Sequence, residues 1–75
     1  MNNQEEAKKF FLDGINSYSE KNYEKAIIEF EKSLSLAPNR PSILLNLSIS
    51  YFQIKNYREA KKNLKILLSL DNCEK

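Results

Sequence analysis

The sequence holds few side chains that could perform chemistry on a bound molecule. Histidine is absent from the 75 residues, and Cys73 is the only cysteine. There is no glycine-rich phosphate loop, and no set of cysteines has the spacing of zinc ligands. The closest carboxylates, Glu5 with Glu6 and Glu29 with Glu31, are expected as solvated charge on helix surfaces and not as an acid and base pair. We therefore expect a protein that is not an enzyme and that holds no cofactor or metal.

The charged residues are unevenly distributed along the chain. Residues 1–40 hold six basic and seven acidic side chains (net −1), whereas residues 41–75 hold six basic and three acidic ones (net +3). Four of the cations recur at helical spacing: Arg58, Lys61, Lys62 and Lys65. They predict one basic stripe on the outer face of a helix, which we interpret as a solvated face, with contact to an acidic partner as the alternative. Because the total charge is only +2, we expect no nucleic-acid partner.

The composition predicts one small helical domain spanning residues 1–75. Hydrophobic residues make up 41% of the chain and charged residues 29%, which is typical of a folded, soluble domain. One glycine and two prolines are too few for the turns of an all-β fold. The acidic N-terminus does not resemble a signal peptide, and no run approaches the roughly 20 apolar residues of a membrane span. A single cysteine excludes an internal disulfide, so we expect a cytoplasmic protein with no membrane partner.

Apolar residues recur with a period near 3.6 and predict four helices, at about 4–19, 23–36, 41–54 and 57–70. The second helix is expected to end at the stretch APNRPS, because its two prolines disfavour helical backbone. The third helix is apolar on more than one side and should have neighbours on two faces. Both short connections contain KNY, where Asn22 and Asn56 are expected to adopt left-handed backbone or to cap the following helix.

The chain repeats itself at an interval of 34 residues, with KNYEKA at 21–26 and KNYREA at 55–60. The same shift aligns further apolar positions: Ile15 with Ile49, Phe30 with Leu64, and Leu34 with Leu68. A period near 34 with two helices in each unit resembles the tetratricopeptide repeat (TPR). In this resemblance Gly14 and Ser48 take the places of the small residue at which the two helices of a unit cross closely.

The resemblance implies an all-α fold of two antiparallel helix-turn-helix hairpins, four helices in all, stacked as a short right-handed solenoid. Repeat one is expected at about 7–40 and repeat two at about 41–74. Three residues depart from the family pattern: Asp13 replaces leucine, Ser17 replaces an aromatic residue and Asn72 replaces proline. The opening helix of the first unit is therefore the weaker match, and the exit of the second unit is undefined.

The resemblance also implies a non-catalytic protein-interaction module that binds a peptide or a helix in an apolar concave groove. The first helix of each unit would line this groove with Lys8, Phe11, Ile15, Tyr18, Leu45, Asn46, Ile49 and Phe52. The alternative is that these side chains pack into the core. Asn46 stands where chaperone-tail-binding members grip a peptide backbone, but the other residues of that clamp are missing, so we expect a hydrogen bond between helices instead.

The fourth helix should direct Leu64, Leu67 and Leu68 toward a further helix. Stacked repeats generally need about three units for independent stability, and this chain has two. We therefore expect self-association through these leucines, most simply as a homodimer. A structural self-assembly unit, or a fragment of a longer TPR array, is the alternative function, and the identity of a partner is left open.

Overall fold

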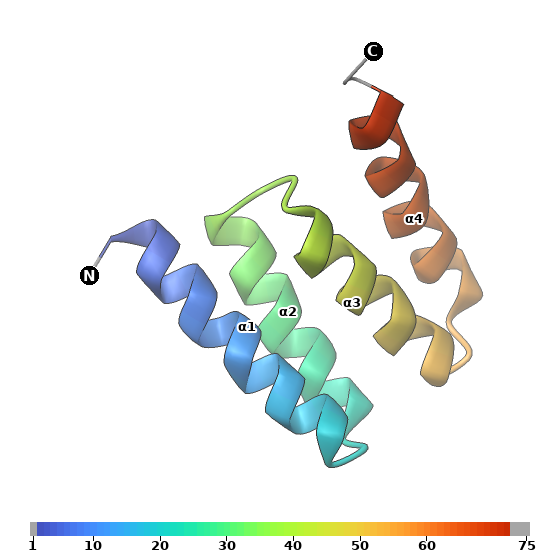
Figure 1. Ribbon diagram of the computed structural model, residues 1–75. Coiled ribbons are helices and arrows are strands. Elements are labelled where there is room, and N and C mark those ends of the chain that lie inside the picture. The colour runs from blue at the N-terminus through green and yellow to red at the C-terminus, as the bar shows by residue number, and fades with distance from the viewer. Residues whose placement is uncertain (1, 73–75) are drawn as a thin grey trace.

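The computed structural model describes residues 2–72, which form four α-helices and no strand (Figure 1). The helices are α1 (Asn3–Ser19), α2 (Tyr23–Leu36), α3 (Pro41–Gln53) and α4 (Tyr57–Asn72). They follow one another across the molecule in chain order, so that α1 and α2 form one hairpin and α3 and α4 form the next. The predicted all-α architecture of two hairpins is confirmed, with helix ends that differ from the predicted ones by at most two residues.

The two KNY connections have the same geometry. Lys21 and Lys55 adopt left-handed backbone, with φ of 65° and 66°. The Oδ1 atoms of Asn22 and Asn56 each accept a hydrogen bond from the backbone N–H three residues later, at 3.3 and 3.4 Å. The asparagines thus cap α2 and α4, as one of the two predicted possibilities, while the preceding lysines reverse the chain.

The first hairpin closes tightly around Gly14 on α1 and Phe30 on α2. A Cβ atom placed on Gly14 would lie 2.5 Å from Cε1 of Phe30, so a larger residue does not fit without movement. The hydroxyl of Ser33 donates a buried hydrogen bond of 2.7 Å to the carbonyl oxygen of Ala7, which joins α2 to the start of α1. The predicted close crossing at Gly14 is therefore present.

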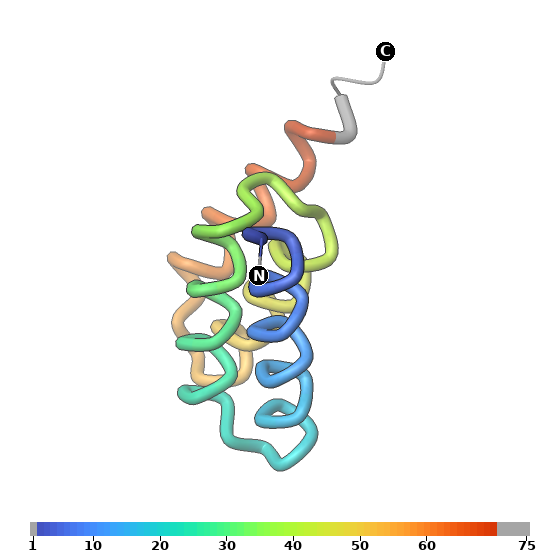
Figure 2. Tube along the Cα trace, turned by 90° about the vertical axis from the view of Figure 1, so that its left-hand side faces the viewer, coloured from blue at the N-terminus to red at the C-terminus, as the bar shows by residue number. Residues whose placement is uncertain are grey.

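The hydrophobic core lies between the first hairpin and α3. It is built from Ala26, Ile27 and Phe30 of α2 and from Ile43 and Leu47 of α3. The fourth helix contributes less, because its buried residues within positions 57–70 are Ala60 and Asn63. Figure 2 shows the first hairpin from the side, with α1 and α2 running beside each other, and the chain is flat, with extents of 37 × 34 × 15 Å. Within the described residues α4 packs chiefly against α3, and Leu64 and Leu68 of α4 are exposed.

None of the helices within residues 2–72 combines the length and the apolar character that crossing a membrane requires.

Candidate protein-binding face

The predicted groove residues are divided between two environments. Phe11, Ile15 and Tyr18 on α1 are partly buried and pack against the core that α3 completes. Leu45, Ile49 and Phe52 are exposed on α3. The residues therefore do not form one continuous exposed strip, because α3 covers the first-unit half of it.

The two polar groove residues differ as well. Lys8 is exposed on α1. Asn46 is partly buried, and its Nδ2 atom donates a 2.8 Å hydrogen bond to the carbonyl oxygen of Ser42 in its own helix. The expectation that Asn46 bonds another helix is wrong. The amide returns to the backbone one turn earlier, a local partner that is always within its reach.

Five apolar side chains form an exposed surface across α3 and α4, which we call the open face: Leu45, Ile49, Phe52, Leu64 and Leu68. Their side chains are between 38% and 60% exposed. At the centre is an apolar hollow of about 230 Å³, lined by Ile49, Phe52 and Leu64 with the buried Ser48 and Ala60 below. Of the three leucines predicted to self-associate, Leu64 and Leu68 belong to this face, whereas Leu67 is half-buried.

The open face has a covered counterpart in the first unit. A shift of 34 residues maps its members onto Phe11, Ile15, Tyr18, Phe30 and Leu34. All five of these lie in the core or pack against it, and the core includes Ile43 and Leu47 of α3. In addition, Nε2 of Gln53 on α3 donates a hydrogen bond of 3.1 Å to the hydroxyl of Tyr18 on α1. The open face is thus the second unit's copy of the surface that α3 covers in the first.

The family model of the tetratricopeptide repeat matches residues 17–40 and 41–72. The chain belongs to the tetratricopeptide repeat family. These repeats are generally protein–protein interaction modules and are typically non-catalytic. The first match begins inside α1, beyond Asp13, which stands where the family prefers leucine. No solved structure significantly matches the chain.

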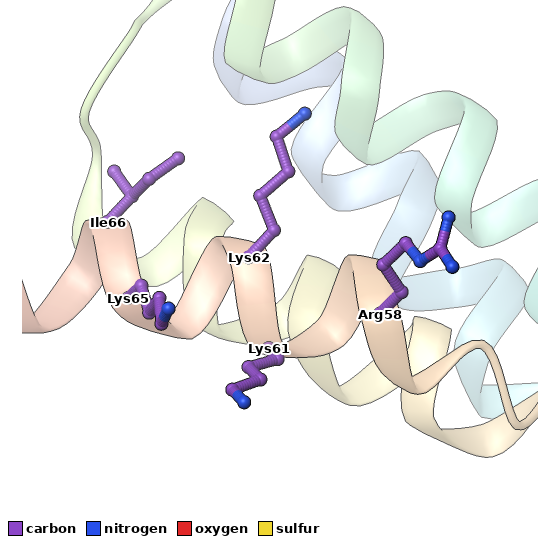
Figure 3. A pocket seen from close by; sticks show the side chains of 5 residues that line it. All are labelled: Arg58, Lys61, Lys62, Lys65 and Ile66. Atoms are coloured by element: carbon purple, nitrogen blue, oxygen red, sulfur yellow. The ribbon is translucent and has the colours of Figure 1, made fainter.

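The basic residues of α4 in the second TPR hairpin lie beside the open face. Arg58, Lys62 and Ile66 lean toward one edge of a shared face of α4, and Lys61 leans toward the other edge (Figure 3). All four cations are exposed, and together with Ile66 they line one shallow hollow on α4. Their i, i+3, i+4 and i+7 spacing keeps them on one face of the helix, so the predicted basic stripe is present. Lys61 and Lys65 lie within one helical turn of Leu64 and Leu68, so they border the open face.

Two polar residues with structural roles were missed from the sequence. Asn63 is buried on α4, where its Nδ2 donates a 2.8 Å hydrogen bond to the carbonyl oxygen of Glu59. The hydroxyl of Tyr51 on α3 donates a 2.7 Å hydrogen bond to Oε2 of Glu31 on α2. Burial, and then the hydrogen bond and charge of Glu31, raise the pKa of Tyr51. Asn63 lies three residues after Ala60, a spacing that could have placed it on the buried side of the helix.

Proposed function

We propose that this TPR protein is a non-catalytic interaction module that binds a helix or a helical peptide of another protein on the open face. One observation supports the proposal above the others. The open face repeats, residue for residue, a surface that holds α3 in the first unit, yet its own side chains are exposed. The equivalent surface of the first unit binds α3, so the apolar side chains of the open face are suited to bind another helix. Contiguous exposed apolar surface of this kind marks interaction sites in soluble proteins.

Self-association is the second candidate. The exposure of Leu64 and Leu68 on α4 supports it, because a second copy could cover both. For either candidate we propose a cytoplasmic location, since a lone cysteine suits a reducing compartment.

The first experiment uses the helix that covers the first unit as a probe for the second. A synthetic peptide with the sequence of residues 41–53 is titrated into the full chain, with affinity measured by calorimetry and the contact surface mapped by NMR chemical shifts. We expect shifts at Ile49 and Leu64, and at least tenfold weaker binding to Ile49→Asp, because a carboxylate would then be buried against the peptide. Ile28→Asp is the matched control, since Ile28 is similarly exposed, at 54% against 38% for Ile49, but lies on α2 outside the open face.

Two results would contradict the proposal: shifts that lie away from α3 and α4, or equal binding by wild type and Ile49→Asp. Light scattering across concentration tests the second candidate separately. A dimer that Leu64→Asp dissociates and Ile28→Asp does not would support self-association, whereas a monomer at every concentration would exclude it over that range.

A further inference from the structure

We propose that the open face selects a partner helix that carries a carboxylate opposite Lys65, and that this helix comes from another protein and not from a second copy of this chain. The inference rests on the proposed function, since it specifies the chemistry of the helix that the open face binds. It follows from comparing equivalent positions of the two hairpins.

A polar contact lies at the edge of the covered surface. In the first unit, α3 is joined to α2 by the hydrogen bond from the hydroxyl of Tyr51 to the carboxylate of Glu31, at 2.7 Å. The residue 34 positions after Glu31 is Lys65. A helix seated on the open face as α3 sits on the first unit would therefore meet an ammonium group where α3 meets a carboxylate. An ammonium group only donates hydrogen bonds, so the partner must supply an acceptor there, and a carboxylate makes the strongest pair.

Lys61 is a second cation at the same edge. Its counterpart in the first unit is Ile27, which is buried in the core against α3. Lys61 and Lys65 lie one helical turn apart on α4 (Figure 3), and both border the leucines of the open face. The aliphatic stem of Lys61 can extend the apolar surface while its charged end stays at the rim. The matching helix thus has an apolar stripe with acidic residues along one edge.

A second copy stacked head to tail does not meet this description. Its α1 would have to take the place of α3, putting Lys9 where Ile43 lies, Asp13 where Leu47 lies and Ser17 where Tyr51 lies. Leu47 is fully buried in its own setting, so a carboxylate in the equivalent place would be removed from water, while Lys61, in the place of Ile27, keeps its charged end at the rim. Ser17 would offer Lys65 a short hydroxyl in place of a charge.

A two-fold dimer through α4 fails for a different reason. It would bring the lysine-bearing edges of both copies into one interface, because a two-fold contact pairs each surface patch with itself. Like charges placed together at an interface oppose association. An acidic helix from another protein removes this repulsion and turns it into attraction.

The test uses the full chain and two forms of the peptide of residues 41–53, one carrying Tyr51→Glu and the other Tyr51→Lys. We expect wild type to bind the glutamate form at least tenfold more tightly at low ionic strength, with the preference falling as salt is added. Lys65→Glu should reverse the preference, and Lys65→Ala should abolish it. Lys62→Glu is the matched control, because it makes the same change of charge on the same helix but farther around α4 from the leucines of the open face, and it should keep the wild-type preference.

The outcomes separate this inference from the proposed function. Equal affinity of the two peptides, with shifts mapped to the open face, would overturn the inference and leave the proposed function standing. A preference that Lys62→Glu reverses as fully as Lys65→Glu would also overturn it, because net charge would then explain the result. If neither peptide binds, the proposed function itself fails.

Discussion

The close contact between Gly14 and Phe30 makes a quantitative prediction for the variant Gly14→Ala. The added methyl group would lie 2.5 Å from Cε1 and 2.6 Å from Cδ1 of Phe30, against 3.4–4 Å for ordinary contact, so the two helices must separate by about 1 Å or the ring must turn. Phe30 is fully buried and cannot swing into solvent. Overpacking of this kind costs about 1–3 kcal/mol, and the better helix propensity of alanine returns about 1 kcal/mol. Because two ring atoms lie within 2.6 Å of the added methyl group, we expect a cost in the upper part of that range, about 2–3 kcal/mol, and therefore a net loss of about 1–2 kcal/mol.

Urea unfolding followed by far-ultraviolet circular dichroism measures this loss. The second unit supplies the control. There Ser48 takes the place of Gly14 and Leu64 takes the place of Phe30, so a side chain larger than that of glycine lies opposite one smaller than that of phenylalanine. Gly14→Ala should therefore cost much less in a Phe30→Leu background, giving a coupling energy of about 1 kcal/mol between the two sites. Ser48→Ala should change the free energy of unfolding by well under 1 kcal/mol, since its hydroxyl bonds only within its own helix.

A Gly14→Ala variant as stable as wild type would show that the contact with Phe30 does not limit the size of residue 14. An equal cost of Gly14→Ala in wild type and in the Phe30→Leu background would show that the ring of Phe30 is not the obstacle.

Two further predictions concern hydrogen bonds between helices. Tyr51→Phe removes the bond to Glu31 and should lower the free energy of unfolding by about 0.5–1 kcal/mol in urea at neutral pH, a small effect because the pair is solvent-accessible. The pKa of Tyr51 is raised above its ordinary 10.0, so the contribution of its hydroxyl to the free energy of unfolding is present below pH 10 and is lost as the pH rises further. The difference in the free energy of unfolding between wild type and Tyr51→Phe should therefore be smaller at pH 11 than at pH 8. Ser33→Ala removes the buried 2.7 Å bond to Ala7 and should cost about 1 kcal/mol in the same assay, with exposed Ser35→Ala as the control.

The fold could be predicted because several local signals agreed with one another. The 34-residue repeat, the prolines between the hairpins and the asparagine caps each specify a boundary, and boundaries of this kind depend on neighbouring residues along the chain. Gly14 could be placed at the helix crossing for the same reason, because its position within the 34-residue repeat follows directly from the sequence.

The exposure of the candidate site could not be predicted in the same way. Family positions indicate which side of a helix a residue occupies, but they do not show what covers that side. Phe11 and Leu45 occupy equivalent places, and only the presence of α3 over the first makes one partly buried and the other exposed. Asn63 was missed because a polar residue on the inner side of a helix breaks the apolar pattern, and its burial depends on a hydrogen bond to its own backbone.

The two hairpins share their backbone geometry, so the residues that differ between equivalent places reflect what each surface meets. On the first hairpin, Ile27 and Glu31 meet α3, and one is buried in the core while the other accepts a hydrogen bond from Tyr51. On the second, lysines stand at both places. Apolar side chains continue across the open face, but the charge at its edge is inverted, so a helix like α3 lacks the acidic edge that the second hairpin favours. We infer that the shared scaffold suits the open face to a helix and that the two lysines select which helix it is.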